Sequence, residues 1–254
     1  SQMGLAGAAI AFVAARTVSF LMYVYYVYKD DLLIFDLDNF WQSSRDIMHV
    51  GLPAILSNII GPVSMSVITR LLAGHGAVVV AGFSVASRIE TMFAMVIWAL
   101  SMSVAPFVGQ NWGAKYFKRV TRSLRIGNLF ALAWGVFSYL VLIVLGPFVI
   151  SLVNSDQAVI DTATVYLMIV PLGMGLMGVL SNCMSSFNAL GQPGPPFIMS
   201  VCQMIFLSIP FAMLGDYLFG YHGIFAGGVL SILIIALVSY VWLKRNIRFG
   251  ELQG

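Results

Sequence analysis

Charge is what this sequence has least of. Asp, Glu, Lys and Arg make up only 9% of its 254 residues, whereas about 25% is usual in soluble domains. So few charges cannot cover the apolar side chains, which amount to 60% of the chain, against about 45–50% in ordinary domains. The composition therefore excludes an ordinary soluble domain and predicts an integral membrane protein.

Cysteine is also scarce, and the common enzyme motifs are missing. Cys183 and Cys202 both fall in apolar stretches, without the spacing of a metal or redox site. The sequence contains no G-x-S-x-G, H-E-x-x-H or Walker A motif. We therefore expect neither catalytic residues nor a cofactor.

The alternation of apolar and polar residues that marks a membrane β-barrel is absent as well. Long apolar segments take its place, each near or above the roughly 20 residues that a spanning helix needs. The sequence thus predicts an all-α membrane protein with seven transmembrane helices. They are expected at about 4–28, 47–72, 79–106, 124–149, 158–182, 196–216 and 222–243.

Lys and Arg fall on alternate connections between these segments. The connections 74–78, 154–161 and 220–222 contain neither residue. Because cytoplasmic loops of membrane proteins are rich in Lys and Arg, the pattern predicts a cytoplasmic C-terminus and places the start of the chain on the outer side. The residues assigned to the inner side are Lys29, Arg45, Lys115, Lys118, Arg119, Arg122, Arg125, Lys244, Arg245 and Arg248.

The longest polar break, at 29–46, alternates acidic residues with Leu, Ile, Phe and Trp. We expect this segment to lie along the inner membrane interface and to mark a boundary between two units. The chain opens without an initiator Met or a basic leader, and is already apolar. It is therefore expected to be a fragment of a longer polypeptide.

Three charged residues, Arg16, Arg88 and Glu90, lie inside apolar segments. A charge at the bilayer centre costs about 2.5–3.5 kcal/mol on insertion scales, so embedded charges usually serve a purpose. Arg88 and Glu90 are two positions apart, which puts them on different faces of a helix. Glu90 is interpreted either as a site for a sodium ion or proton in a cavity, or as half of a structural ion pair with an arginine such as Arg88.

Further polar side chains could line the same cavity, although each is also explained as a hydrogen bond between helices. They are Asn58, Thr91, Asn182, Asn188 and Gln203.

Glycines are spaced in a way that predicts close packing of helices, and prolines within the segments predict interruptions of the helices. Gly175 and Gly178 share one segment, and Gly223 and Gly227 share another, at spacings that let helices approach closely. Pro62, Pro171 and Pro210 are expected to kink or interrupt their helices.

Several motifs together resemble the multidrug and toxic compound extrusion (MATE) transporters. The most specific is GQNWGA at 109–114, read with VASRIE at 85–90 and SMSVAPFV at 101–108. The resemblance continues through further motifs in the same order. These are GLPA at 51–54, RLLAGHG at 70–76, VPLGMG at 170–175 and ALGQPGPP at 189–196.

The resemblance implies a twelve-helix transporter of two six-helix lobes, of which this chain holds one. Residues 1–28 then correspond to the last helix of the N-terminal lobe, and 29–46 to the cytoplasmic linker between lobes. Residues 47–243 form the C-terminal lobe, and 244–254 a cytoplasmic tail. The implied partners are the missing N-terminal lobe, the lipid bilayer and small organic substrates, without nucleic acid, in a bacterial or archaeal plasma membrane.

The implied activity is efflux of organic, often cationic and amphipathic compounds by antiport with sodium or protons. Members of the NorM-like branch carry coupling carboxylates on the first and fourth helices of this lobe. Here 51–73 contains no acidic residue, and Asp161 lies at the outer edge of the segment at 158–182, so the chain resembles the DinF-like branch more. Two alternatives remain: a lipid-linked oligosaccharide flippase of the same superfamily, and a channel or non-transporting membrane scaffold.

Overall fold

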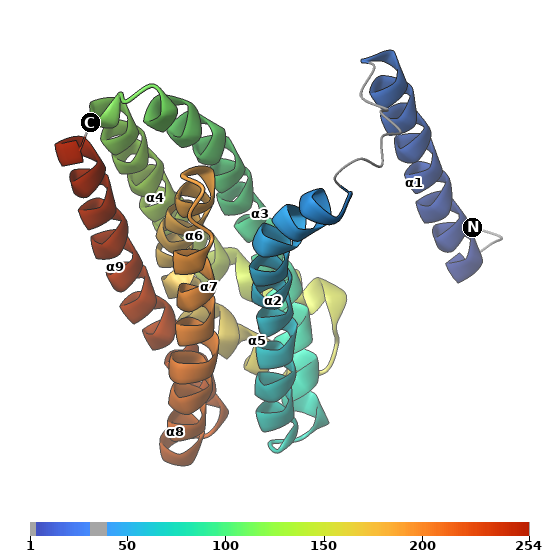
Figure 1. Cartoon of the computed structure of the whole chain (residues 1–254). Coiled ribbons are helices and arrows are strands. Elements are labelled where there is room, and N and C mark those ends of the chain that lie inside the picture. The colour runs from blue at the N-terminus through green and yellow to red at the C-terminus, as the bar shows by residue number, and fades with distance from the viewer. Residues whose placement is uncertain (1–3, 31–39, 254) are drawn as a thin grey trace. The chain divides into compact units, whose positions relative to one another are not determined.

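The computed structural model of the protein describes residues 4–30 and 40–253, and within these ranges the secondary structure is entirely helical (Figure 1). The elements in order are α1 (Gly4–Lys29), α2 (Phe40–Ala73), α3 (Ala77–Gly113), α4 (Phe117–Val153), α5 (Gln157–Ile169), the 3-10 helix η1 (Val170–Gly173), α6 (Met174–Ala189), α7 (Gly194–Val201), the π-helix η2 (Cys202–Ser208), α8 (Ile209–Phe219) and α9 (Tyr221–Gln253).

The chain divides into two compact units between His49 and Val50. The first unit holds α1 and the first residues of α2. In α1 the guanidinium carbon of Arg16 lies 5.3 Å from the centre of the Phe12 ring, four residues earlier. Arg16 therefore has an aromatic neighbour on its own helix. Residues 31–39 of the predicted linker lie outside the described residues.

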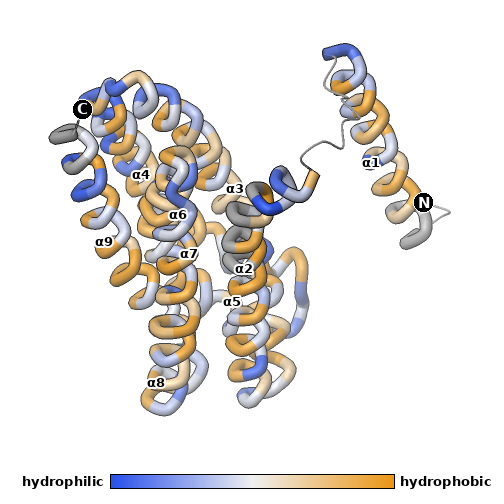
Figure 2. Tube along the Cα trace, in the orientation of Figure 1, coloured by the Kyte–Doolittle hydropathy of each residue, from blue (hydrophilic) through white to orange (hydrophobic). Residues whose placement is uncertain are grey.

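The fold class predicted from the sequence is confirmed. Among the described residues, six helical stretches are long and apolar enough to cross a membrane. The predicted segment 47–72 falls in α2, whose apolar part is the shorter stretch Ile59–Ala73. Figure 2 shows the hydrophobic residues along the middle of the helices and hydrophilic ones toward their ends. The six stretches are Ala9–Lys29, Ala77–Gly113, Phe117–Val153, Gln157–Ala189, Gly194–Phe219 and Tyr221–Arg248.

Such long helices suit a bilayer, because the hydrocarbon offers no water to satisfy backbone N–H and C=O groups. Two of them are interrupted near prolines, as the sequence predicts. Pro171 lies in the 3-10 helix η1 between α5 and α6, and Pro210 follows the π-helix η2. Both prolines therefore coincide with departures from α-helical hydrogen bonding, whereas α2 is assigned as one α-helix through Pro62.

The core of the second unit consists of two apolar clusters. One surrounds Phe83 and Tyr166 and draws residues from α2, α3, α4, α5, α6, α8 and α9. The other surrounds Val108 and Phe187 and includes the far end of α9. Along α3 the two clusters are separated by the buried Ser101, so a polar layer lies between them.

Glycines set the closest contacts between helices. A Cβ at Gly135 of α4 would lie 2.4 Å from the backbone nitrogen of Gly175 in α6. A Cβ at Gly223 of α9 would lie 2.0 Å from the carbonyl oxygen of Gly215 in α8. Both pairs bring backbones into direct contact, as the spacing of small residues predicts.

The predicted tail 244–254 continues α9 as far as Gln253. Its end lies close to the connection between α3 and α4, because the ring of Trp112 occupies the space that a side chain at Gly250 would need. The basic residues of α9 and those of 115–125 thus gather at one end of the unit (Figure 1).

Candidate functional site

The embedded acid Glu90 lies half-buried on α3 and is bound by a tyrosine from α5. The hydroxyl of Tyr166 donates a hydrogen bond to Oε2 of Glu90. At about 1.5 Å per residue, Glu90 is about 20 Å along α3 from Ala77, within the stretch Ala77–Gly113 that is apolar enough to span a membrane. The pair therefore joins two spanning helices through an ionisable group.

Aromatic rings surround the tyrosine of this pair. The Phe83 ring lies edge-on to Tyr166 at 5.5 Å, and the Phe225 ring does so at 5.1 Å from the other helix, α9. All three rings are buried, and edge-to-face pairs of this kind are favourable arrangements of the ring quadrupoles. The rings fix the position of Tyr166, so its hydroxyl is held toward Glu90.

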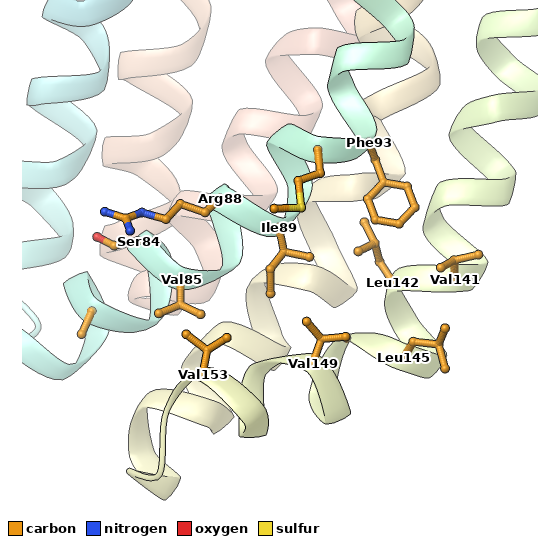
Figure 3. Close-up of a pocket in the computed structure, with 13 residues that line it drawn as sticks. Ser84, Val85, Arg88, Ile89, Phe93, Val141, Leu142, Leu145, Val149 and Val153 are labelled. Atoms are coloured by element: carbon orange, nitrogen blue, oxygen red, sulfur yellow. The ribbon is translucent and has the colours of Figure 1, made fainter. Parts of the chain in front are cut away.

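Arg88 lies at the edge of an apolar groove of about 690 Å³ between α3 and α4, with its guanidinium outside the groove (Figure 3). Figure 3 shows its guanidinium directed away from the apolar side chains of α4, on the side of Ser84. Among the described residues no acidic group lies within 4 Å of it. The structure thus shows no ion pair between Arg88 and Glu90. The groove is lined by Ala81, Ser84, Val85, Arg88, Ile89, Met92, Phe93, Val141, Leu142, Leu145, Gly146, Val149 and Val153.

Asn182 belongs to the polar layer between the two apolar clusters. Ser101 of α3 donates to its Oδ1 at 2.9 Å, and its Nδ2 donates to Oδ1 of Asn128 in α4 at 3.1 Å. Asn182 is fully buried. Because Ser101 is about 16 Å along α3 from Glu90, this network is separate from the acid and joins α3, α4 and α6.

The structure does not gather the remaining predicted residues at Glu90. Thr91 is exposed and donates to the carbonyl of Ser87 on its own helix. Asn188 is exposed at the end of α6, where Ala189 lies against Gly109 of α3, about 30 Å from the level of Glu90. Gln203 lies half-buried in the π-helix η2. The side chain of Asn58 lies outside the described part of the chain.

The sequence did not predict the residues that complete the Glu90 site and the polar layer around Asn182. Tyr166, Phe83 and Phe225 are ordinary aromatic residues of apolar segments, and nothing in their spacing indicates that they meet. Asn128 could have been found, because it is an amide inside the apolar segment 124–149, as Asn182 is inside 158–182.

The Glu90 site is suited to holding a proton or a monovalent cation. Among the described residues, no group of three or more His, Cys, Asp or Glu is placed to hold a metal ion. A carboxyl group and a phenol can exchange a proton or accept a cation, and any such change alters the bond between α3 and α5. The arrangement can therefore connect the ionisation of Glu90 to the position of α5 relative to α3.

Comparison with known proteins gives a consistent result. The MatE family model matches residues 53–214. The chain is 28% identical over 211 residues to a protein of Shewanella oneidensis named "FAD transporter", covering 83% of this chain and 47% of that protein. It is 24% identical over 245 residues to "Probable multidrug resistance protein YpnP" of Bacillus subtilis, covering 96% of this chain and 55% of that one.

Solved structures of the same kind superpose well. The Vibrio cholerae MATE transporter VcmN in its bent form matches with a TM-score of 0.86 and 28% identity, covering 99% of this chain and 58% of VcmN. The MATE transporter ClbM in complex with Rb⁺ matches with a TM-score of 0.82 and 21% identity, which speaks for the fold alone. The chain spans about half the length of the curated relatives it matches.

Proposed function

The chain belongs to the MatE family of membrane transporters, which are not enzymes, and from that membership we propose that it supplies one lobe of a secondary active efflux transporter. Its substrates are organic, often cationic and amphipathic compounds, exported in exchange for an inward-moving ion. One relative, YpnP of Bacillus subtilis, is named "Probable multidrug resistance protein". No cofactor is required, since the ion gradient supplies the free energy.

The partner of this lobe is a second, N-terminal lobe. The relatives of Shewanella oneidensis and Bacillus subtilis are about twice as long as this chain, and α1 falls in a unit separate from the bundle. We assign 1–28 to the end of the N-terminal lobe, 29–46 to the linker, 47–243 to the C-terminal lobe and 244–254 to the tail. The absence of acid in 51–73 favours the DinF-like branch over the NorM-like branch.

The orientation follows from the basic residues. Those of 115–125 and 244–248 gather at one end of the bundle, so this end and the C-terminus are assigned to the cytoplasm. We assign the protein to a bacterial or archaeal plasma membrane; the two relatives described above come from the bacteria Shewanella oneidensis and Bacillus subtilis.

The bond from Tyr166 to Glu90 is the observation that carries the mechanism. When Glu90 takes up an ion, the strength of this bond changes, and hydrogen bonds to charged groups contribute about 1.5–3 kcal/mol. Tyr166 lies just before the 3-10 helix η1, where the helix is already irregular. Ion uptake at Glu90 therefore shifts the balance between two positions of α5 relative to α3, and substrate favours the opposite position.

A proton suits this site better than a sodium ion. Hard cations need several oxygen ligands at once, whereas the neighbours of Tyr166 are the carbon rings of Phe83 and Phe225. The hydroxyl of Thr91 is engaged with Ser87 on its own helix. We therefore assign a proton as the ion handled by this lobe.

A second candidate function is export of an anionic, phosphate-bearing compound. The relative named "FAD transporter" favours it, and Arg88 is an exposed cation inside the spanning stretch of α3. A lipid-linked oligosaccharide would need a similar anion site, but a pyrophosphate calls for more charge than one arginine supplies.

Transport by the full-length parent in proteoliposomes separates these functions. The proposal expects a cationic dye to move against its gradient when a proton gradient is imposed, and to stop when the gradient is collapsed. Movement of FAD but of no cationic dye would favour the anion exporter. A steady ionic conductance without substrate exchange would identify a channel. If the protein showed neither transport nor conductance, the result would favour a non-transporting scaffold.

A further inference from the structure

A groove of about 470 Å³ lies between α4 and α9 at the basic end of the bundle. It does not include Glu90 or Arg88, and the transport mechanism proposed above makes no use of it. It is lined by Thr121, Leu124, Arg125, Asn128, Tyr240, Leu243, Lys244, Ile247 and Arg248.

Positive charge dominates this groove. Arg125 comes from α4, and Lys244 and Arg248, one turn apart, come from α9. All three side chains are exposed, and no acidic residue lines the groove. Three cations from two helices, with no acidic side chain among the described residues that line the groove, form a site for an anion with more than one oxygen.

A buried donor points to the same ligand. Asn128 lines the groove although it is only 7% exposed. Its Oδ1 accepts from Asn182 at 3.1 Å, whereas its buried Nδ2 has no hydrogen-bond partner in the described part of the chain. Buried amide donors are rarely left unpaired, because desolvation without a partner is unfavourable. The free donor is therefore available to an oxygen of a bound molecule.

Apolar residues form the floor of the groove. Leu124, Leu243 and Ile247 are all buried there, so the charged side chains of the rim lie directly beside apolar side chains. Tyr240 is 42% exposed beside them, and tyrosine favours the boundary between lipid tails and headgroups. The spanning stretch of α9 ends at Arg248, which puts the cations at headgroup level.

From this combination we propose that the groove binds an anionic phospholipid of the leaflet that faces the basic end of the protein. The phosphate lies between Arg125, Lys244 and Arg248, and the acyl chains lie on the side of the exposed Tyr240. Asn128 donates to an ester or phosphate oxygen. A soluble phosphate compound would satisfy the same cations, but they lie at the end of the spanning stretch of α9, where lipid headgroups surround them, so a lipid is the occupant that fits this position.

The test uses the full-length parent in nanodiscs of phosphatidylcholine with and without phosphatidylglycerol. Native mass spectrometry counts the phosphatidylglycerol retained per protein, and the melting temperature is measured alongside. Lys244→Gln with Arg248→Gln should reduce retained phosphatidylglycerol by about fivefold for each cation removed, since one Lys or Arg near the surface contributes about 1 kcal/mol. Phosphatidylglycerol should raise the melting temperature of the wild type and not that of this double variant.

Arg245→Gln is the matched control. Arg245 follows Lys244 directly but lies on another face of α9, beside Trp242 and Val241. It should retain phosphatidylglycerol within about twofold of the wild type. Equal losses in Arg245→Gln and Lys244→Gln would mean a general surface attraction and overturn the site. Stabilisation by free pyrophosphate in pure phosphatidylcholine, with none from phosphatidylglycerol, would overturn the lipid as occupant.

Discussion

The hydroxyl of Tyr166 binds the carboxyl group of Glu90, so an ionisable side chain of α3 is held by α5. Tyr166 is in turn enclosed by Phe83 and Phe225, which ties the same site to α9. A change in the ionisation of Glu90 therefore alters contacts that join three helices of the lobe, α3, α5 and α9.

Replacing Glu90 by Gln in the full-length parent should reduce efflux of a cationic dye by at least about fivefold, because coupling free energies between sites are typically about 1–3 kcal/mol. Gln keeps the size of the side chain and an oxygen that can accept from Tyr166, but it cannot take up a proton. Expression and the melting temperature should stay close to the wild type. Unchanged efflux would remove Glu90 from the mechanism.

Tyr166→Phe should produce a smaller loss of efflux and move its dependence on pH. The change deletes the hydroxyl and keeps the ring between Phe83 and Phe225, so the hydrogen bond to Glu90 is removed without a cavity. Efflux rates across a pH series measure the effect. Tyr217→Phe serves as control, because Tyr217 is 86% exposed. If the two variants gave the same pH profile, the bond would play no part in coupling.

Gly135→Ala should lower the stability of the lobe by about 1–3 kcal/mol, the usual range for overpacking. The added methyl would lie 2.4 Å from the backbone nitrogen of Gly175, and a backbone atom cannot move aside as a side chain can. Gly228→Ala is the control, since its methyl would meet nothing within 4 Å. Thermal unfolding in detergent measures both, and equal melting temperatures would contradict the close contact of α4 and α6.

Asn182→Ala should lower stability by about 1–3 kcal/mol, because it strands buried hydrogen-bonding groups. Ser101 would lose its acceptor on Asn182, and Asn128 would lose its donor. Asn188→Ala, on the exposed end of the same helix, should stay within about 0.5 kcal/mol. Thermal unfolding measures the stability of both variants. Similar losses of stability in the two would contradict a structural role for the polar layer.

The sequence predicts the helices well because apolar length is a local property. Six of the expected segments coincide with stretches able to cross a membrane, and Pro171 and Pro210 mark the irregular turns. The sequence predicts one side of the contact between Gly135 and Gly175, because Gly175 belongs to a run of spaced glycines. The role of Gly135 follows only from the packing of α4 against α6.

The site is predicted less completely. A charge inside an apolar run is conspicuous, so Glu90 and Arg88 stand out in the sequence. Their partners do not, because the neighbour of Glu90 is decided by how α5 packs on α3, over a separation of 76 residues. For the same reason Asn182 and Asn188 look alike in the sequence, yet one is fully buried and the other exposed.

Proton release on substrate binding tests the role of Glu90 most directly. A cationic dye is added to the purified full-length parent in weakly buffered detergent solution, and the protons released per dye bound are counted. The wild type is predicted to release more protons than Glu90→Gln, with Tyr166→Phe in between. Equal release from the wild type and Glu90→Gln, at equal dye occupancy, would contradict the assignment of Glu90 as the proton site of this lobe.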